Sequence, residues 1–103
     1  MASMSYDSGN FHASLVAAVG DDAGLINDLR TAFIESAERG VDALEHARCA
    51  DSWKNAAWRL HGLCASFGVM NMIGLAREAE NGEIGDSRVI RRLRTAIAVL
   101  KAA

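Results

Sequence analysis

The residues most able to do chemistry lie in one stretch near the middle of the chain, residues 53–68. Placed on a helix at about 100° per residue, this stretch has one apolar side that suits a core. The opposite side carries a tryptophan and a histidine among small and polar neighbours: Lys54, Trp58, His61, Gly62 and Ala65. Because a large aromatic side chain gains little from folding at such a position, this side is typical of a docking surface.

His61 is the candidate nucleophile on this surface. An imidazole that accepts a phosphoryl group must reach a partner, and Gly62 beside it removes steric cover. The same position also suits an ordinary solvated histidine. Trp58 in turn also suits packing against the N-terminal segment or a second copy of the chain. The spacing alone leaves these alternatives open.

Helices must position these residues, because the chain has no proline and its apolar residues recur at helical spacing. Residues 1–10 show no apolar face and are expected to form a flexible tail, with one helical domain over 11–103. Capping residues are expected at Asp21 or Asp22, at Asp51 or Ser52, and at Asp86 or Ser87. Helices are expected over about 11–19, 25–47, 52–67, 69–80 and 87–100, with a loop at 81–85. Short connections between long helices predict an all-α, up-and-down antiparallel four-helix bundle with a short extra N-terminal helix.

Composition excludes several classes of function. The formal net charge of −2 argues against nucleic acid as the main partner. No apolar run approaches the roughly 20 residues that span a bilayer, and the first residues do not read as a secretory signal, so a cytoplasmic protein is expected. Cys49 and Cys64 have neither metal nor redox spacing, and Cys64 falls on the apolar side of its helix. We expect no metal, no cofactor and no conventional enzymatic site.

The segment Ala57-Trp58-Arg59-Leu60-His61-Gly62-Leu63, continuing to Gly68-Val69, resembles the histidine-phosphotransfer (HPt) domain. The similarity runs from about residue 11 to residue 80. That family is a four-helix bundle that relays phosphate between receiver-domain aspartates in bacterial two-component signalling. Its motif is His-x-Leu-Lys-Gly-Ser, with a glycine ten residues after the histidine. In register with it, Leu60, Gly62 and Gly68 match.

The departures from the motif concern its chemistry. Trp58 occupies the phospho-accepting position, His61 the lysine position and Leu63 the serine position. Since an indole cannot accept a phosphoryl group, the resemblance implies one of two roles. Either the domain docks receiver domains or histidine kinases without transfer, as an adaptor, decoy or inhibitor, or His61 serves as a displaced acceptor. The partner-binding residues expected on this basis are Lys54, Trp58, Arg59, His61, Gly62 and Ala65.

Four arginines gather at the start of the last expected helix: Arg88, Arg91, Arg92 and Arg94. One interpretation pairs them with nearby carboxylates, namely Glu78, Glu80, Glu83 and Asp86. The other reserves some of them for an acidic partner. A third possibility for the whole chain is a self-associating helical protein outside phosphorelay.

Overall fold

The computed structural model describes the backbone of residues 2–102 and the side chains of residues 11–102, and all of its regular structure is helical. This confirms the all-α class. The helices, in chain order, are α1 (Ala2–Val19), α2 (Ala23–Glu45), α3 (Ala50–Phe67), α4 (Met70–Asn81) and α5 (Ser87–Ala102). Within the described residues, none of these helices combines the length and apolar character that crossing a bilayer needs.

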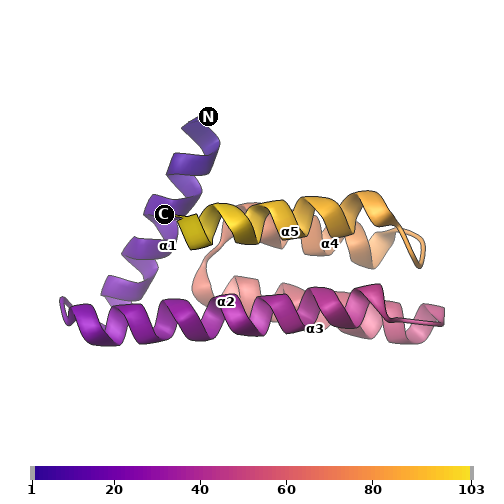
Figure 1. Ribbon diagram of the computed structural model, residues 1–103, viewed down its shortest axis with the longest axis horizontal. Coiled ribbons are helices and arrows are strands. Elements are labelled where there is room, and N and C mark those ends of the chain that lie inside the picture. The colour runs from indigo at the N-terminus through magenta and orange to yellow at the C-terminus, as the bar shows by residue number, and fades with distance from the viewer. Residues whose placement is uncertain (1, 103) are drawn as a thin grey trace.

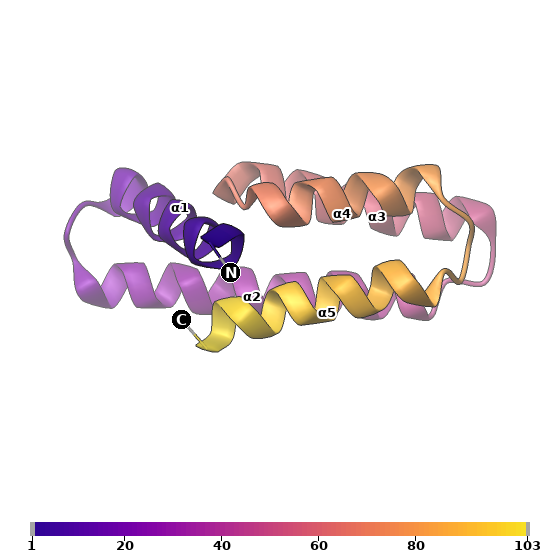
Figure 2. The same cartoon turned by 90° about the horizontal axis from the view of Figure 1, so that it is seen from above.

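Helices α2 to α5 form a ring of neighbours, in which α2 and α4 each contact both α3 and α5. In Figure 1, α2 and α3 make the lower layer and α5 and α4 the upper one, and consecutive helices run in opposite directions. The view turned by 90° agrees, with α4 over α3 and α5 over α2 (Figure 2). Helix α1 crosses one end of this group and contacts α2, α3 and α5.

The start of α1 corrects one predicted boundary. The backbone of residues 2–10, expected to be a flexible tail, is helical as the first half of α1. Phe11 and Leu15 are buried and fix the second half of α1 against the core. Once these turns are in place, further helical residues need no new nucleation, and no proline interrupts the segment. Residues 1 and 103 lie outside the described part of the chain.

The helix caps follow the sequence at two of the three predicted places. The side chain of Asp22 accepts a hydrogen bond from the Leu25 amide, and that of Asp86 accepts one from the Arg88 amide. At α3 the prediction of Asp51 or Ser52 as N-cap is wrong, because the N-cap is Cys49. Its Sγ accepts from the Ser52 amide while the Ser52 hydroxyl hydrogen-bonds the Cys49 backbone, so a thiol takes the place that a hydroxyl usually has in a capping box.

Close helix contacts explain two glycines. A Cβ on Gly40 would lie 3.0 Å from Leu60 Cδ1, so α2 and α3 pack closely at this point. Gly68 ends α3 with a φ of +68°, and a Cβ there would lie 2.8 Å from the Ser14 hydroxyl on α1. At this end of the molecule Phe11, Phe33 and Phe67 join α1, α2 and α3, with ring centroids 5.0–6.3 Å apart.

Candidate functional site

The outer side of α3 carries the exposed tryptophan that the helical pattern predicted. Trp58 is 66% exposed, and Lys54, Gly62 and Ala65 are exposed around it. A Cβ added to Gly62 would meet no atom within 4 Å, so the backbone is open beside the indole. The five residues predicted for this side of α3 therefore share one surface, although His61 is half-buried at its edge.

His61 has a partner that the sequence analysis did not assign to it. Its Nδ1 lies 2.8 Å from Oε2 of Glu80 on α4, and both side chains are about two-thirds covered. A carboxylate can only accept, so Nδ1 carries the proton and Nε2 is the ring nitrogen left for other chemistry. His61, which was predicted to be a basic contact for a partner, is thus hydrogen-bonded to an acidic side chain 19 residues further along the chain.

A second hydrogen bond fixes α4 against α3 beneath this pair. Trp53 is 1% exposed, and its Nε1 donates to the backbone carbonyl of Ala79 at 2.7 Å. Ala79 and Glu80 therefore tie the last turn of α4 to α3 on two successive residues. Beside these contacts lies a shallow groove between the two helices, which we call the indole groove. It is lined by Lys54, Asn55, Trp58, Glu80 and Asn81.

Arg59 does not belong to the indole groove. It follows Trp58 by one residue, and the helix turns it toward α2, where it lines a different groove with Arg39 and Arg48. Asn55 lines both grooves and lies on the ridge between them. The structure therefore divides the predicted partner-binding set, with Lys54, Trp58 and His61 on the α4 side and Arg59 on the α2 side.

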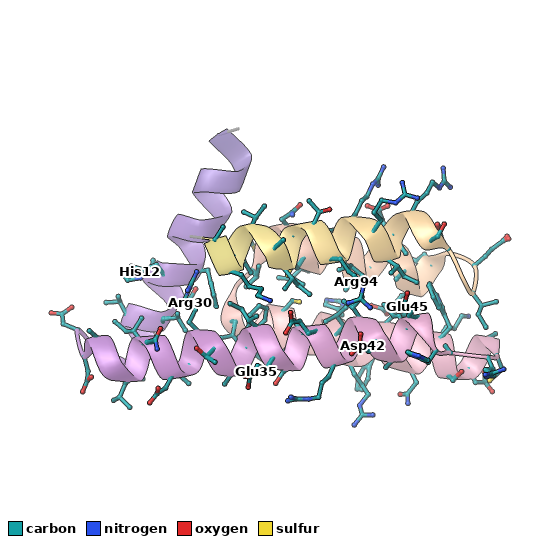
Figure 3. The ribbon with its side chains drawn as sticks, in the orientation of Figure 1. His12, Arg30, Glu35, Asp42, Glu45 and Arg94 are labelled. Atoms are coloured by element: carbon teal, nitrogen blue, oxygen red, sulfur yellow. The ribbon has the colours of Figure 1, made fainter. Side chains whose placement is uncertain are left out.

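The arginines of α5 are mostly paired, but only in part with the carboxylates expected. Arg88 lies 3.7 Å from Asp86, and Arg92 lies 3.3 Å from Glu78. Arg94 crosses instead to α2, where it contacts Asp42 at 2.9 Å and Glu45 at 2.5 Å (Figure 3). These two carboxylates raise the pKa of the Arg94 guanidinium by accepting its hydrogen bonds. Within residues 11–102, Arg91 has no carboxylate within 4.0 Å and lines an apolar hollow between α4 and α5.

The two cysteines, Cys49 at the N-cap of α3 and Cys64 within the helix, occupy opposite environments. Burial raises the pKa of the Cys64 thiol to about 12, which confirms its predicted place in the core. Cys49 is exposed, and hydrogen bonds from Ser52 lower the pKa of its thiol because they favour the thiolate. Among the described side chains, no group of three His, Cys, Asp or Glu residues is arranged to hold a metal ion.

Sequence reasoning missed Asn55, Asn81 and the role of Glu80 in the indole groove. The sequence did contain an indication for Glu80: it follows Ala79, which is buried, and so borders the apolar stripe of α4. The register of α4 against α3, which brings Glu80 to His61, is set by packing across the turn at Gly68.

Comparison with protein-family models, with curated proteins and with solved structures finds no match for this chain.

Proposed function

We propose that this chain is an HPt-like signalling module of a bacterial two-component phosphorelay, which docks receiver domains or histidine kinases without conventional phosphoryl transfer. One observation carries the proposal: Trp58, at the register position of the phospho-accepting histidine, is 66% exposed on a helix whose other side is packed. An indole at this position would still contact a partner but has no atom that can accept a phosphoryl group. The role would be that of an adaptor, decoy or inhibitor, and the setting the bacterial cytoplasm.

The arrangement of the helices supports this assignment. The ring of α2 to α5, with neighbouring helices in opposite directions, fits an up-and-down four-helix bundle with α1 as the additional helix. In such a bundle the outer side of α3 is available to a partner over its whole length. The Trp53–Ala79 hydrogen bond keeps α3 and α4 in fixed register, so the indole groove is formed before a partner arrives.

A receiver domain presents an acidic pocket with an apolar rim, and the indole groove offers matching groups. The Trp58 ring would bury its apolar face against the rim and serve as the central anchor of the interface. Lys54, also exposed in the groove, would lie near the acidic pocket. Open backbone at Gly62 would allow the partner to approach α3 closely.

A second candidate function, transfer through His61, is favoured by the Glu80 contact. With the proton of neutral His61 on Nδ1, the Nε2 lone pair could attack a receiver's aspartyl phosphate. The bond between phosphorus and the aspartate oxygen would break, the Nε2–phosphorus bond would form, and Glu80 would stabilise the positive imidazolium. His61 lies about 4.5 Å along the axis and about 60° around it from Trp58. Because transfer depends strongly on geometry, this shift demands a differently docked partner, and we rank it second.

Binding titrations against a panel of receiver domains and histidine kinases test the proposal. Trp58→Ala should weaken binding by about 2 kcal/mol or more and leave thermal stability nearly unchanged. Met70→Ala is a matched control, because Met70 is a large apolar side chain, 60% exposed, at the other end of α4. If Trp58→Ala binds the partner as tightly as Met70→Ala does, Trp58 is not part of the interface. Sedimentation of the natural chain completes the test, since a dimer that Trp58→Ala dissociates would indicate self-association instead.

A further inference from the structure

A groove between α2 and α3, on the other side of α3 from most of the indole groove, gathers positive charge. Its charged lining consists of Arg39, Arg48 and Arg59, and we call it the basic groove. No carboxylate is among the residues that line it. Within residues 11–102, none of the three arginines has a carboxylate within 4.0 Å. This concentration of cations occurs in a chain whose formal net charge is −2.

The charges of α2 are segregated between its two neighbours. On the side toward α5, Asp42 and Glu45 bind Arg94, and Glu38 binds Lys101 at 3.1 Å. On the side toward α3, the Arg39 guanidinium donates to the Ser36 hydroxyl at 3.1 Å, a neutral partner that also lines the groove. The acidic residues that could neutralise the basic groove are therefore mostly engaged elsewhere. Glu35, one turn before Arg39, is exposed but is not part of the lining.

The floor of the basic groove is formed by small or buried apolar residues. Gly40, Ala43 and Ala56 are small, and Leu60 fills the space above Gly40 while being only 2% exposed itself. The backbone groups of both helices are used within the helices, so an extended peptide would find no edge to pair with. The charged groups that line this groove are guanidinium groups, so we expect recognition of an anion to rest on them.

We propose that the basic groove binds an anion carrying several phosphate groups in a row, such as a polyphosphate chain, free or on a nucleoside. Guanidinium groups bind phosphate oxygens bidentately, and the Asn55 amide in the lining supplies a further donor. Arg39 precedes the end of α2 at Glu45 by six residues, about 9 Å of helix rise, and Arg48 lies beyond that end of the helix. A single phosphate is too small to reach both ends, whereas a chain of phosphates can. This site is independent of the docking function proposed above.

Calorimetric titration of the full chain with inorganic tripolyphosphate tests the site. We expect binding at one site, weakened about fivefold or more by Arg39→Ala and by Arg48→Ala. Arg77→Ala is the matched control, since Arg77 is exposed on α4 outside the groove and its loss changes the net charge equally. It should change the affinity less than about twofold, because exposed charges at a distance are screened by salt. Orthophosphate should bind much more weakly than tripolyphosphate.

Any of three results would overturn the proposed site. These are no binding of tripolyphosphate, a weakening by Arg77→Ala equal to that by Arg39→Ala and Arg48→Ala, or binding of a glutamate-rich peptide as tight as that of tripolyphosphate. Adenosine triphosphate, titrated in parallel, identifies the source of the phosphates. Tighter binding of the nucleotide than of tripolyphosphate would support a nucleoside polyphosphate, and equal binding would support the chain of phosphates alone. Because Arg39, Arg48 and Arg77 are all exposed, melting temperatures should be similar among the variants.

Discussion

The inner and outer sides of α3 show what the same residue type does in two environments. Trp53 is 1% exposed and donates its indole proton to a carbonyl of α4, whereas Trp58, five residues later, is 66% exposed. The first buries a large apolar surface and stabilises the fold. The second has little to contribute to folding, and we propose for it a role in recognition. The position of each tryptophan around the helix, and not its residue type, decides whether it is buried.

The largest difference that we expect between an exposed and a buried position concerns Cys49, the N-cap of α3, and Cys64 on its inner side. At neutral pH, Cys49 should react with iodoacetamide at least about a thousandfold faster than Cys64. Its thiol pKa is lowered by Ser52, while burial raises that of Cys64 to about 12. Mass spectrometry of peptides from the labelled native chain measures both rates. As pH rises, Cys49 labelling should reach its plateau first, and Ser52→Ala should shift that plateau to higher pH. Similar rates at both thiols would contradict the packing of the inner side.

The next largest difference that we expect is in stability, when each of the two tryptophans is replaced by alanine. Trp53→Ala should lower the free energy of unfolding by about 3–5 kcal/mol, because it leaves a cavity and removes the donor to the Ala79 carbonyl. Trp58→Ala should change it by about 0.5 kcal/mol or less. Urea denaturation measures both. Trp53→Phe is a control that keeps an aromatic ring and loses the hydrogen bond, with an expected cost of about 1–3 kcal/mol. A large loss in Trp58→Ala would place that residue in the core.

The smallest expected effect is a gain in stability at Gly62. Gly62→Ala should stabilise the chain by about 1 kcal/mol, because glycine is unfavourable inside a helix and the new Cβ meets no atom within 4 Å. Gly68→Ala is its counterpart and should be destabilising, since φ there is +68° and Ser14 is in the way. Thermal denaturation distinguishes the two signs. If Gly62→Ala also weakens partner binding, the partner approaches α3 at this residue. A loss of stability in Gly62→Ala would mean that the outer side of α3 is not open.

The sequence was sufficient for the features that depend on one helix at a time. Helical periodicity predicted the exposure of Trp58 and the burial of Cys64. Features that depend on two helices were not predicted. The pairing of His61 with Glu80 and of Arg94 with Asp42 joins residues 19 and 52 positions apart, and it follows from how α3, α4 and α5 are placed by core packing. The polar composition of residues 2–10 gives no sign of a helix, although their backbone continues the helix that Phe11 and Leu15 hold against the core.

Phosphoryl transfer is the most direct test of the claim that Trp58 keeps a docking surface while removing its chemistry. Phosphorylated receiver domains and kinases would be mixed with the natural chain, with His61→Ala and with Trp58→His, and acid-labile label on the chain measured. We predict no label on the natural chain or on His61→Ala, and label on Trp58→His, because that substitution restores an imidazole at the motif position. Label on the natural chain that disappears in His61→Ala would contradict this and show a working relay through the displaced histidine.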